Sequence, residues 1–273
     1  MNRLIFICSF TLFSLFQVKG QSAVNDIPLT LQKLYTAILN ADDDERIRLN
    51  DSVKLIMNDY VMSDSVFRHR FDNLRYLGQI DSPDGKLKLI TWNLPLRKGE
   101  NRYYLYIIRK NKKQENNTVY KLEGKYRQES ASTDKTYSAD NWYGALYYAI
   151  QPFRYNGNKL YLILGLDSDN VNNSRKIIDI LDFNDNDEII FGRDCLLRDG
   201  KRKYREVLEY SADGMISLRL RTKKLIVFDH INPLALGHEN DPESFGAGLS
   251  FDGYSFRKGN WEFKSNIDVR NLK

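Results

Sequence analysis

The chain has 273 residues, with 41 Lys and Arg against 36 Asp and Glu, which gives a formal net charge of +5. Apolar residues at 42% and a mean hydropathy of −0.53 exclude a protein built of many membrane-spanning helices, and 12% aromatic residues argue against intrinsic disorder. Two cysteines exclude a disulfide-rich scaffold and a zinc or iron–sulfur site built from several thiolates.

Residues 1–20 are typical of a secretory signal peptide. Arg3 supplies the positive start, and residues 4–16 form an apolar, uncharged run that is shorter than the ~20 residues needed to span a bilayer. Small residues precede a predicted cut before Gln21. We therefore expect an exported protein, whether periplasmic, at the cell surface or secreted, with an uncleaved membrane anchor as the alternative.

Cleavage before Gln21 changes the charge and the thiol count. It removes Arg3, Lys19 and Cys8, so the net charge falls from +5 to about +3 and Cys195 is left as the one thiol. Such a chain has no internal disulfide, and we expect no transmembrane segment after cleavage. The basic clusters lie beside turn residues at the ends of apolar runs, which favours charged hairpin ends over a nucleic-acid surface.

Residues 21–66 are predicted to be an N-terminal helical segment, with two short helices within residues 26–62. Asp26 is a candidate cap of the first helix, with Pro28 in its first turn. The acidic run at residues 42–45 suits the N-terminus of the second helix, where the dipole favours negative charge. Apolar residues recur at helical spacing and must pack on another element: Leu31, Leu34, Tyr35 and Ile38, then Val53, Ile56, Met57 and Tyr60.

Residues 67–273 are predicted to be a β-rich domain, because the apolar period changes to two from about residue 70. Residues 216–221 alternate between apolar and polar, which indicates a strand with one wet face. Continuous apolar runs are typical of strands buried on both faces, and they occur at residues 103–108, 160–164 and 225–228. A hairpin with Gly259 near its tip is predicted over residues 254–263.

The spacing of turn signals favours an antiparallel meander. Gly85 and Gly99 are 14 residues apart, as are Gly200 and Gly214, which leaves room for one strand between turns. We predict a mainly β fold of roughly ten to thirteen strands, closed as a sandwich or barrel, with the helical pair packed on it. A small propeller ranks third, because no blade period of ~40–45 residues recurs. The polar residues 130–138 are predicted to be a mobile loop.

Candidate acid–base chemistry is confined to the segment after residue 228. Asp229 and His230 are adjacent there, and His238 follows with three acidic residues on the same loop. Their spacing matches no zinc pattern, and turn chemistry around Asn232 and the following proline explains the same residues. We therefore predict no metal and no cofactor, and we keep Asp229 and His230 as an alternative hydrolase-like acid–base site.

Aromatic residues are the other candidate binding material. Trp142 and Tyr143, together with Asp229, His230 and Asp252, are the candidate ligand-binding residues, because exposed aromatics stack on sugars or on a protein partner. Core packing is the alternative for aromatics in a β-rich protein. Cys195 is interpreted as a small core residue rather than a nucleophile.

Six strings in fixed order carry a resemblance to a known group of proteins. They are residues 142–148 (WYGALYY), 164–167 (LGLD), 209–212 (EYSA), 226–230 (IVFDH), 251–254 (FDGY) and 267–271 (IDVRN). Over about residues 74–271 the chain resembles a family of uncharacterised exported β-rich proteins of Bacteroidota. The resemblance implies an envelope or extracellular location and no particular reaction. The chain departs from the family pattern at Leu166 and after Pro233, so the resemblance gives His238 no role.

These observations predict a non-enzymatic binding or envelope-associated module with a protein or glycan partner. The alternative is a hydrolase that uses Asp229 and His230. The two hypotheses differ in what they require of His230: the hydrolase needs its imidazole in a concave pocket with a carboxylate within hydrogen-bond reach.

Overall fold

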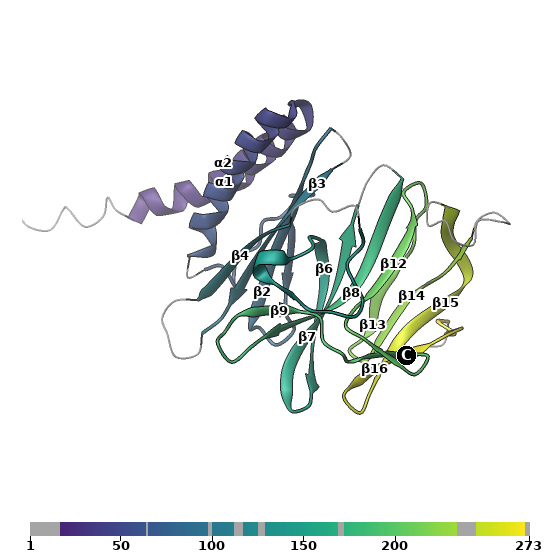
Figure 1. The fold of residues 1–273 in the computed structure, drawn as a ribbon. Helices are drawn as coiled ribbons and strands as arrows, with labels where there is room; N and C mark the ends of the chain where they lie inside the picture. Colours follow the sequence, from purple (N-terminus) through teal and green to yellow (C-terminus); the bar gives the residue numbers. More distant parts are fainter. Residues whose placement is uncertain are drawn as a thin grey trace, which may run out of the picture.

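The computed structural model describes residues 17–63, 65–97, 100–111, 117–124, 129–168, 172–233 and 244–270. Two helices precede the strands, as Figure 1 shows: α1 (Gln17–Asn40) and α2 (Asp43–Val61). The first strands are β1 (Gly78–Asp81), β2 (Leu87–Pro95), β3 (Asn101–Arg109), β4 (Thr118–Gly124) and β5 (Tyr137–Ser138). A single 3-10 turn, η1 (Ala139–Asn141), separates them from β6 (Leu146–Tyr155), β7 (Asn158–Asp167), β8 (Asn173–Phe183) and β9 (Ile189–Phe191). The remaining strands are β10 (Leu196–Arg198), β11 (Lys201–Lys203), β12 (Glu206–Ser211), β13 (Leu218–Thr222), β14 (Leu225–Pro233), β15 (Phe245–Arg257) and β16 (Asn260–Lys264).

The strands form three sheets. The first sheet has the order β1-β2-β3-β4, and the central sheet has the order β5-β9-β8-β7-β6, with β12 also paired to β8. The outer sheet has the order β11-β10-β16-β15-β14-β13, in which β10 and β16 are parallel and the other pairs antiparallel. Within the described residues no sheet closes on itself, so stacked open sheets are observed and the barrel alternative is not.

Three apolar cores lie between four layers. The helices cover one face of the first sheet, the first and central sheets cover each other, and the central and outer sheets enclose the third core. Strand β3 shows why: Tyr103, Leu105 and Ile107 face the central sheet, whereas Tyr104 and the alternating residues after it face the helices. The continuous apolar runs at residues 103–108 and 160–164 are therefore strands with two buried faces, as predicted.

The helical pair is held on the first sheet by polar contacts as well as by packing. The indole Nε1 of Trp92 donates to Oδ1 of Asn50 at 2.9 Å inside the helical core, and the hydroxyl of Tyr106 donates to Oδ1 of Asn58 at 3.0 Å. Asp42 caps α2 by accepting from the backbone N–H of Glu45 at 2.9 Å, which confirms the predicted N-terminus.

The first helix begins earlier than predicted. Helix α1 starts at Gln17 and continues through Asp26 and Pro28, so Asp26 is not its cap. A proline removes one backbone donor, and a helix of 24 residues keeps enough other hydrogen bonds to continue past it. None of the described helices is both long and apolar enough to cross a membrane.

Candidate functional site

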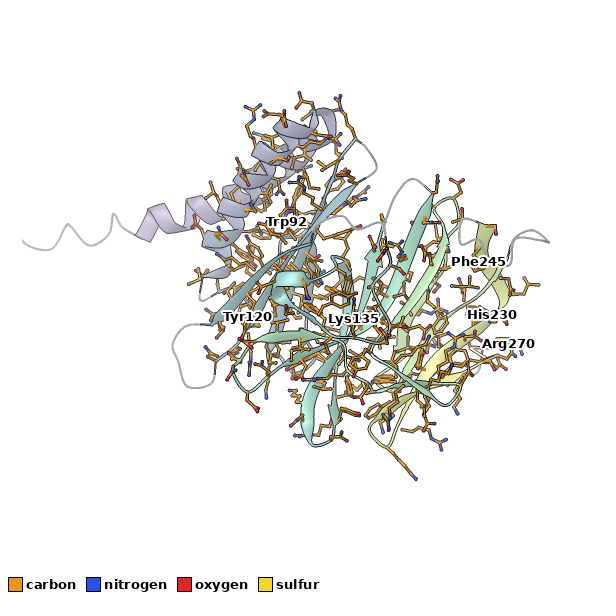
Figure 2. The ribbon with its side chains drawn as sticks, in the orientation of Figure 1. Trp92, Tyr120, Lys135, His230, Phe245 and Arg270 are labelled. Atoms are coloured by element: carbon orange, nitrogen blue, oxygen red, sulfur yellow. The ribbon has the colours of Figure 1, made fainter. Side chains whose placement is uncertain are left out.

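A cavity of about 280 Å³ lies between strand β12 of the central sheet and the outer sheet. The lining residues come from β10, β12, β14 and β15, so two sheets must be stacked for the cavity to exist. Figure 2 shows His230 and Phe245 together on the outer sheet, at the end of the molecule away from Trp92. The wall of the cavity consists of Arg198, Glu206, Val207, Leu208, Glu209, Phe228, His230, Ile231, Phe245 and Asp252.

The cavity contains a histidine–carboxylate pair. Nδ1 of His230 lies 2.6 Å from Oδ2 of Asp252. Asp252 is cross-strand partner to Phe228, and His230 follows Phe228 by two positions, so strand alternation places the imidazole and the carboxylate on one face. Asp252 is 4% exposed at its side chain, and its Oδ1 accepts from the backbone N–H of Asn266 at 3.2 Å, whereas the His230 side chain is 43% exposed. A fixed carboxylate thus orients an accessible imidazole.

A β-bulge beside this pair shapes the cavity rim. The pairing of β14 with β15 shifts between Asp229 and Ile231, which leaves extra residues in β15 opposite His230. Gly248 lies in this bulge, and a Cβ there would be 2.9 Å from the carbonyl oxygen of His230. The backbone of β15 therefore approaches His230 as closely as only glycine allows.

Glu206, a second carboxylate in the cavity wall, already accepts hydrogen bonds from neighbouring side chains. Oε1 of Glu206 accepts from Arg198 at 3.0 Å and from Lys203 at 3.1 Å, and Oε2 accepts from the hydroxyl of Tyr254 at 2.5 Å. Burial, with the Glu206 carboxylate beside it, holds the pKa of Tyr254 far above its usual value, so this hydroxyl stays a donor. Glu206 and Leu208 lie on the same buried face of β12. Glu206 is therefore a charged residue at a core position, which the alternation of apolar residues in this segment could have indicated.

Asp229 lies on the other face of β14. Its Oδ2 accepts from the backbone N–H of Ser217 at 2.7 Å, and its own N–H donates to the carbonyl of Ser217 at 3.1 Å. It is not part of the cavity wall. Of the predicted ligand-binding residues, the structure therefore brings together His230 and Asp252 and separates them from Asp229.

Trp142 and Tyr143 lie in the core between the first and central sheets, 1% and 6% exposed. The hydroxyl of Tyr143 donates to Oδ2 of Asp179 at 2.7 Å, and Nε1 of Trp142 donates to the hydroxyl of Tyr147 at 3.1 Å. These contacts give both aromatics a packing role within a buried polar network, away from the cavity.

A fully buried ion pair completes that network. Nε of Arg205 donates to Oδ2 of Asp179 at 3.1 Å, and its other nitrogens donate to the carbonyls of Ser132, Lys135 and Phe191. Burial raises the pKa of Asp179, and the guanidinium opposes that shift. Residues 129–138, part of which was expected to be a mobile loop, are thus held by a buried cation and contain β5.

Cys195 and the loop that contains His238 were the two other candidate groups. Cys195 is buried in the core between the central and outer sheets, where burial raises the pKa of its thiol to about 12. His238 and the acidic residues near it lie outside the described residues. Across the described ranges, no group of three or more His, Cys, Asp or Glu side chains is arranged to hold a metal ion.

Comparison of the chain with protein-family models, with curated proteins and with solved structures gave no match.

Proposed function

We propose that the protein is an exported, non-enzymatic binding module that takes a small polyhydroxylated ligand, such as a sugar unit of a glycan, in the cavity between β12 and the outer sheet. The observation that carries this proposal is the mixed wall of the cavity, where His230 and Asp252 stand beside Phe245 and Ile231. Hydroxyl groups both donate and accept hydrogen bonds, and the C–H face of a sugar ring packs against apolar and aromatic side chains. Binding sites of this kind combine an apolar surface with a few placed polar groups.

The size of the cavity sets the size of the ligand. A volume of about 280 Å³ is just below the usual range for small-molecule sites, roughly 300–1,000 Å³. One or two sugar rings would occupy it, with the rest of a longer glycan outside. The wall offers Arg198 as a further donor at its edge, since the side chain is 30% exposed although it is paired with Glu206.

The test is a glycan array followed by calorimetry on the best binder. His230→Ala and Phe245→Ala each remove one kind of contact, and we expect each to weaken binding by about 10-fold or more, since the hydrogen bond and the aromatic burial are each worth about 1.5 kcal/mol. Asp229→Asn is the matched control, because it changes the neighbouring residue on the opposite face of the same strand. An array without binders, or an equal loss in the control, would contradict the proposal.

Export is a separate part of the proposal and has its own test. It is supported by the charge and hydropathy pattern of residues 1–20. Expression of the full chain in the native host, followed by N-terminal sequencing of the envelope and medium fractions, should yield a protein that begins at Gln21. A protein found only in the cytoplasm with an intact N-terminus would refute export and leave the cavity proposal standing.

A hydrolase is the second candidate function, and the His230–Asp252 distance of 2.6 Å is the observation that favours it. A buried carboxylate that orients an accessible imidazole is the arrangement of a general base. Among the described residues of the cavity wall there is no Ser, Thr or Cys side chain, and this candidate takes a water activated by His230 as the nucleophile. In this candidate Asp252 takes the role that the sequence analysis gave to Asp229.

Kinetics separate the two functions. If the protein is a hydrolase, wild-type protein should cleave chromogenic glycosides or esters, and Asp252→Asn should lower the rate by about 10²–10⁴-fold while Asp229→Asn leaves it unchanged. If no substrate is cleaved but the array identifies a ligand, the protein is a binder. If cleavage persists in His230→Ala, the dyad is not the catalyst.

A further inference from the structure

Six exposed basic side chains gather at the ends of neighbouring hairpins, and we call this surface the basic end. The residues come from the end of β6, from β11, from the β13–β14 turn and from the β15–β16 turn: Arg154, Arg202, Lys223, Lys224, Arg257 and Lys258. None of them lines the cavity, so the basic end is built from different residues than the proposed ligand site.

Backbone and side-chain contacts bring these segments together around the β15–β16 turn. The carbonyl of Lys224 accepts from the N–H of Phe256 at 2.8 Å, and Nη1 of Arg202 donates to Oδ1 of Asn260 at 3.0 Å. A Cβ placed on Gly259 would lie 3.9 Å from the carbonyl oxygen of Arg154. Figure 1 shows the β6–β7 and β15–β16 hairpins projecting from the same end of the molecule.

The charge at this end is not neutralised. Across the described residues, none of the six side chains takes part in an ion pair. Two acidic residues lie beside this surface: the Asp194 carboxylate accepts from the hydroxyl of Tyr155 at 3.0 Å and its backbone carbonyl accepts from Arg202 at 2.9 Å, and Glu262 lies 3.8 Å from Lys264. Six like charges are therefore held on one end of the folded chain without an ion-pair partner among the described residues.

The backbone conformation of these turns does not require a lysine at any position. Lys258 has a φ of 45° and is followed by Gly259 at 86°, a two-residue hairpin turn that favours asparagine at the first position. Lys223 and Lys224 occupy the two loop positions between the paired residues Thr222 and Leu225. The exposed side chains of these short turns are charged or polar.

We propose that the basic end docks on the anionic head groups of a phospholipid surface. Several projecting tips can touch a flat surface at once, whereas a protein that follows a single-stranded nucleic acid uses a charged groove with aromatic platforms. Each Lys or Arg near an anionic bilayer contributes favourably, and the attraction falls off within a Debye length. Because the tips carry no apolar side chain to insert, the attachment is electrostatic and reversible. This inference does not depend on the proposed ligand.

The experiment is co-sedimentation with vesicles. We expect the protein to bind phosphatidylcholine vesicles that contain about 30% phosphatidylglycerol at roughly 0.05 M salt, and not vesicles of phosphatidylcholine alone, with release at about 0.5 M salt. The variant Lys223→Gln, Lys224→Gln, Arg257→Gln, Lys258→Asn should partition at least about 100-fold less. The last change keeps a favoured turn residue, so folding is retained, which circular dichroism will verify.

The matched control removes four exposed basic side chains from the helices and first-sheet side: Lys33→Gln, Arg75→Gln, Arg102→Gln, Lys121→Gln. It has the same net charge as the test variant and should bind vesicles like the wild type. Equal losses in both variants would assign the binding to overall charge and overturn the proposal. Salt-sensitive binding to heparin or DNA without binding to anionic vesicles would also overturn it, in favour of a soluble polyanion.

Discussion

Arg205 is a cation with no access to solvent, and its guanidinium makes four hydrogen bonds, one to the Asp179 carboxylate and three to backbone carbonyls. It connects the central sheet to residues 132 and 135, which precede β5. A cation in such a place is stable only while all its partners are present, because an unpaired buried charge costs several kcal/mol.

We predict that Arg205→Ala lowers the free energy of unfolding by about 3–5 kcal/mol, because it leaves the Asp179 carboxylate buried without its counter-charge. Urea denaturation followed by fluorescence measures this loss. Arg193→Ala is the control, since it breaks a partly exposed pair with Asp182 (2.6 Å, 33% exposed at Arg193) and should cost about 1 kcal/mol or less. A similar, small loss in both variants would contradict a structural role for the buried pair.

Cys195 allows a test of burial and of leader removal in one measurement. With a pKa of about 12, only about one thiol in ten thousand is ionised at pH 8, and the side chain is also out of reach. We predict no reaction with Ellman's reagent in the native state and one thiol per chain in guanidinium. Two thiols after denaturation would show that Cys8 is retained, and fast native labelling would contradict the burial of Cys195.

His230 shows which part of the site could be predicted from sequence. His230 and its partner Asp252 are both among the residues that the sequence suggests. Adjacency in the sequence, however, pairs His230 with Asp229. In a strand, adjacent residues point to opposite faces, so the imidazole and the Asp229 carboxylate could share a face only in a loop. The apolar run of this strand ends at residue 228, which predicts a loop at Asp229 and His230, whereas β14 continues to Pro233.

At the scale of elements, the start of the second helix could be predicted because the residues that cap it are adjacent in the sequence. Asp42 is the cap and three acidic residues fill the first turn. We predict that Asp42→Ala costs about 0.5–2 kcal/mol of stability, since the N–H of Glu45 loses its acceptor.

Thermal unfolding of two variants measures this effect. Asp59→Ala makes the same change on an exposed position near the other end of α2, where an acidic side chain opposes the helix dipole. It should leave the melting temperature unchanged or raise it slightly. An equal drop in both variants would show that the cap contributes nothing specific.

The strands were predictable where apolar runs or turns mark them, as for β3, β7 and the β15–β16 hairpin with its turn at Gly259. Short strands were not: β5, β9, β10 and β11 have two or three residues each, too few for a period. The cavity could not be predicted either, because it needs β12 to pair with β8 and then face β15, and no local pattern encodes that contact.

At the scale of the whole molecule, the helical pair is a cover for the first sheet. It buries Ile90, Trp92 and Tyr104, which would otherwise form an exposed apolar face. The predicted boundary at residue 67 separates two segments of sequence that share one core. The helices and the first sheet are therefore expected to fold together.

We predict that a chain beginning at residue 67 aggregates or binds a hydrophobic dye strongly, while a chain beginning at Gln21 is monomeric and does not. Size-exclusion chromatography and dye fluorescence at equal concentration make the comparison. A monomeric, cooperatively unfolding 67–273 fragment would mean that the helices are dispensable for the fold.

Both faces of the central sheet pack against another sheet, and this has a consequence for how its strands align. In β8, Ile177 and Leu181 face one core while Ile178 and Ile180 face the other. If β8 shifted its register by one residue, its isoleucines would move from one apolar core to the other at little cost. Hydrophobic burial alone therefore does not select the register of β8. Asp179 breaks this degeneracy, because the same slip would carry its carboxylate away from Arg205 into hydrocarbon. Asp179, the most deeply buried of three buried charged residues in β8 beside Arg175 and Asp182, thus marks the correct alignment for a strand whose isoleucines would otherwise fit two ways.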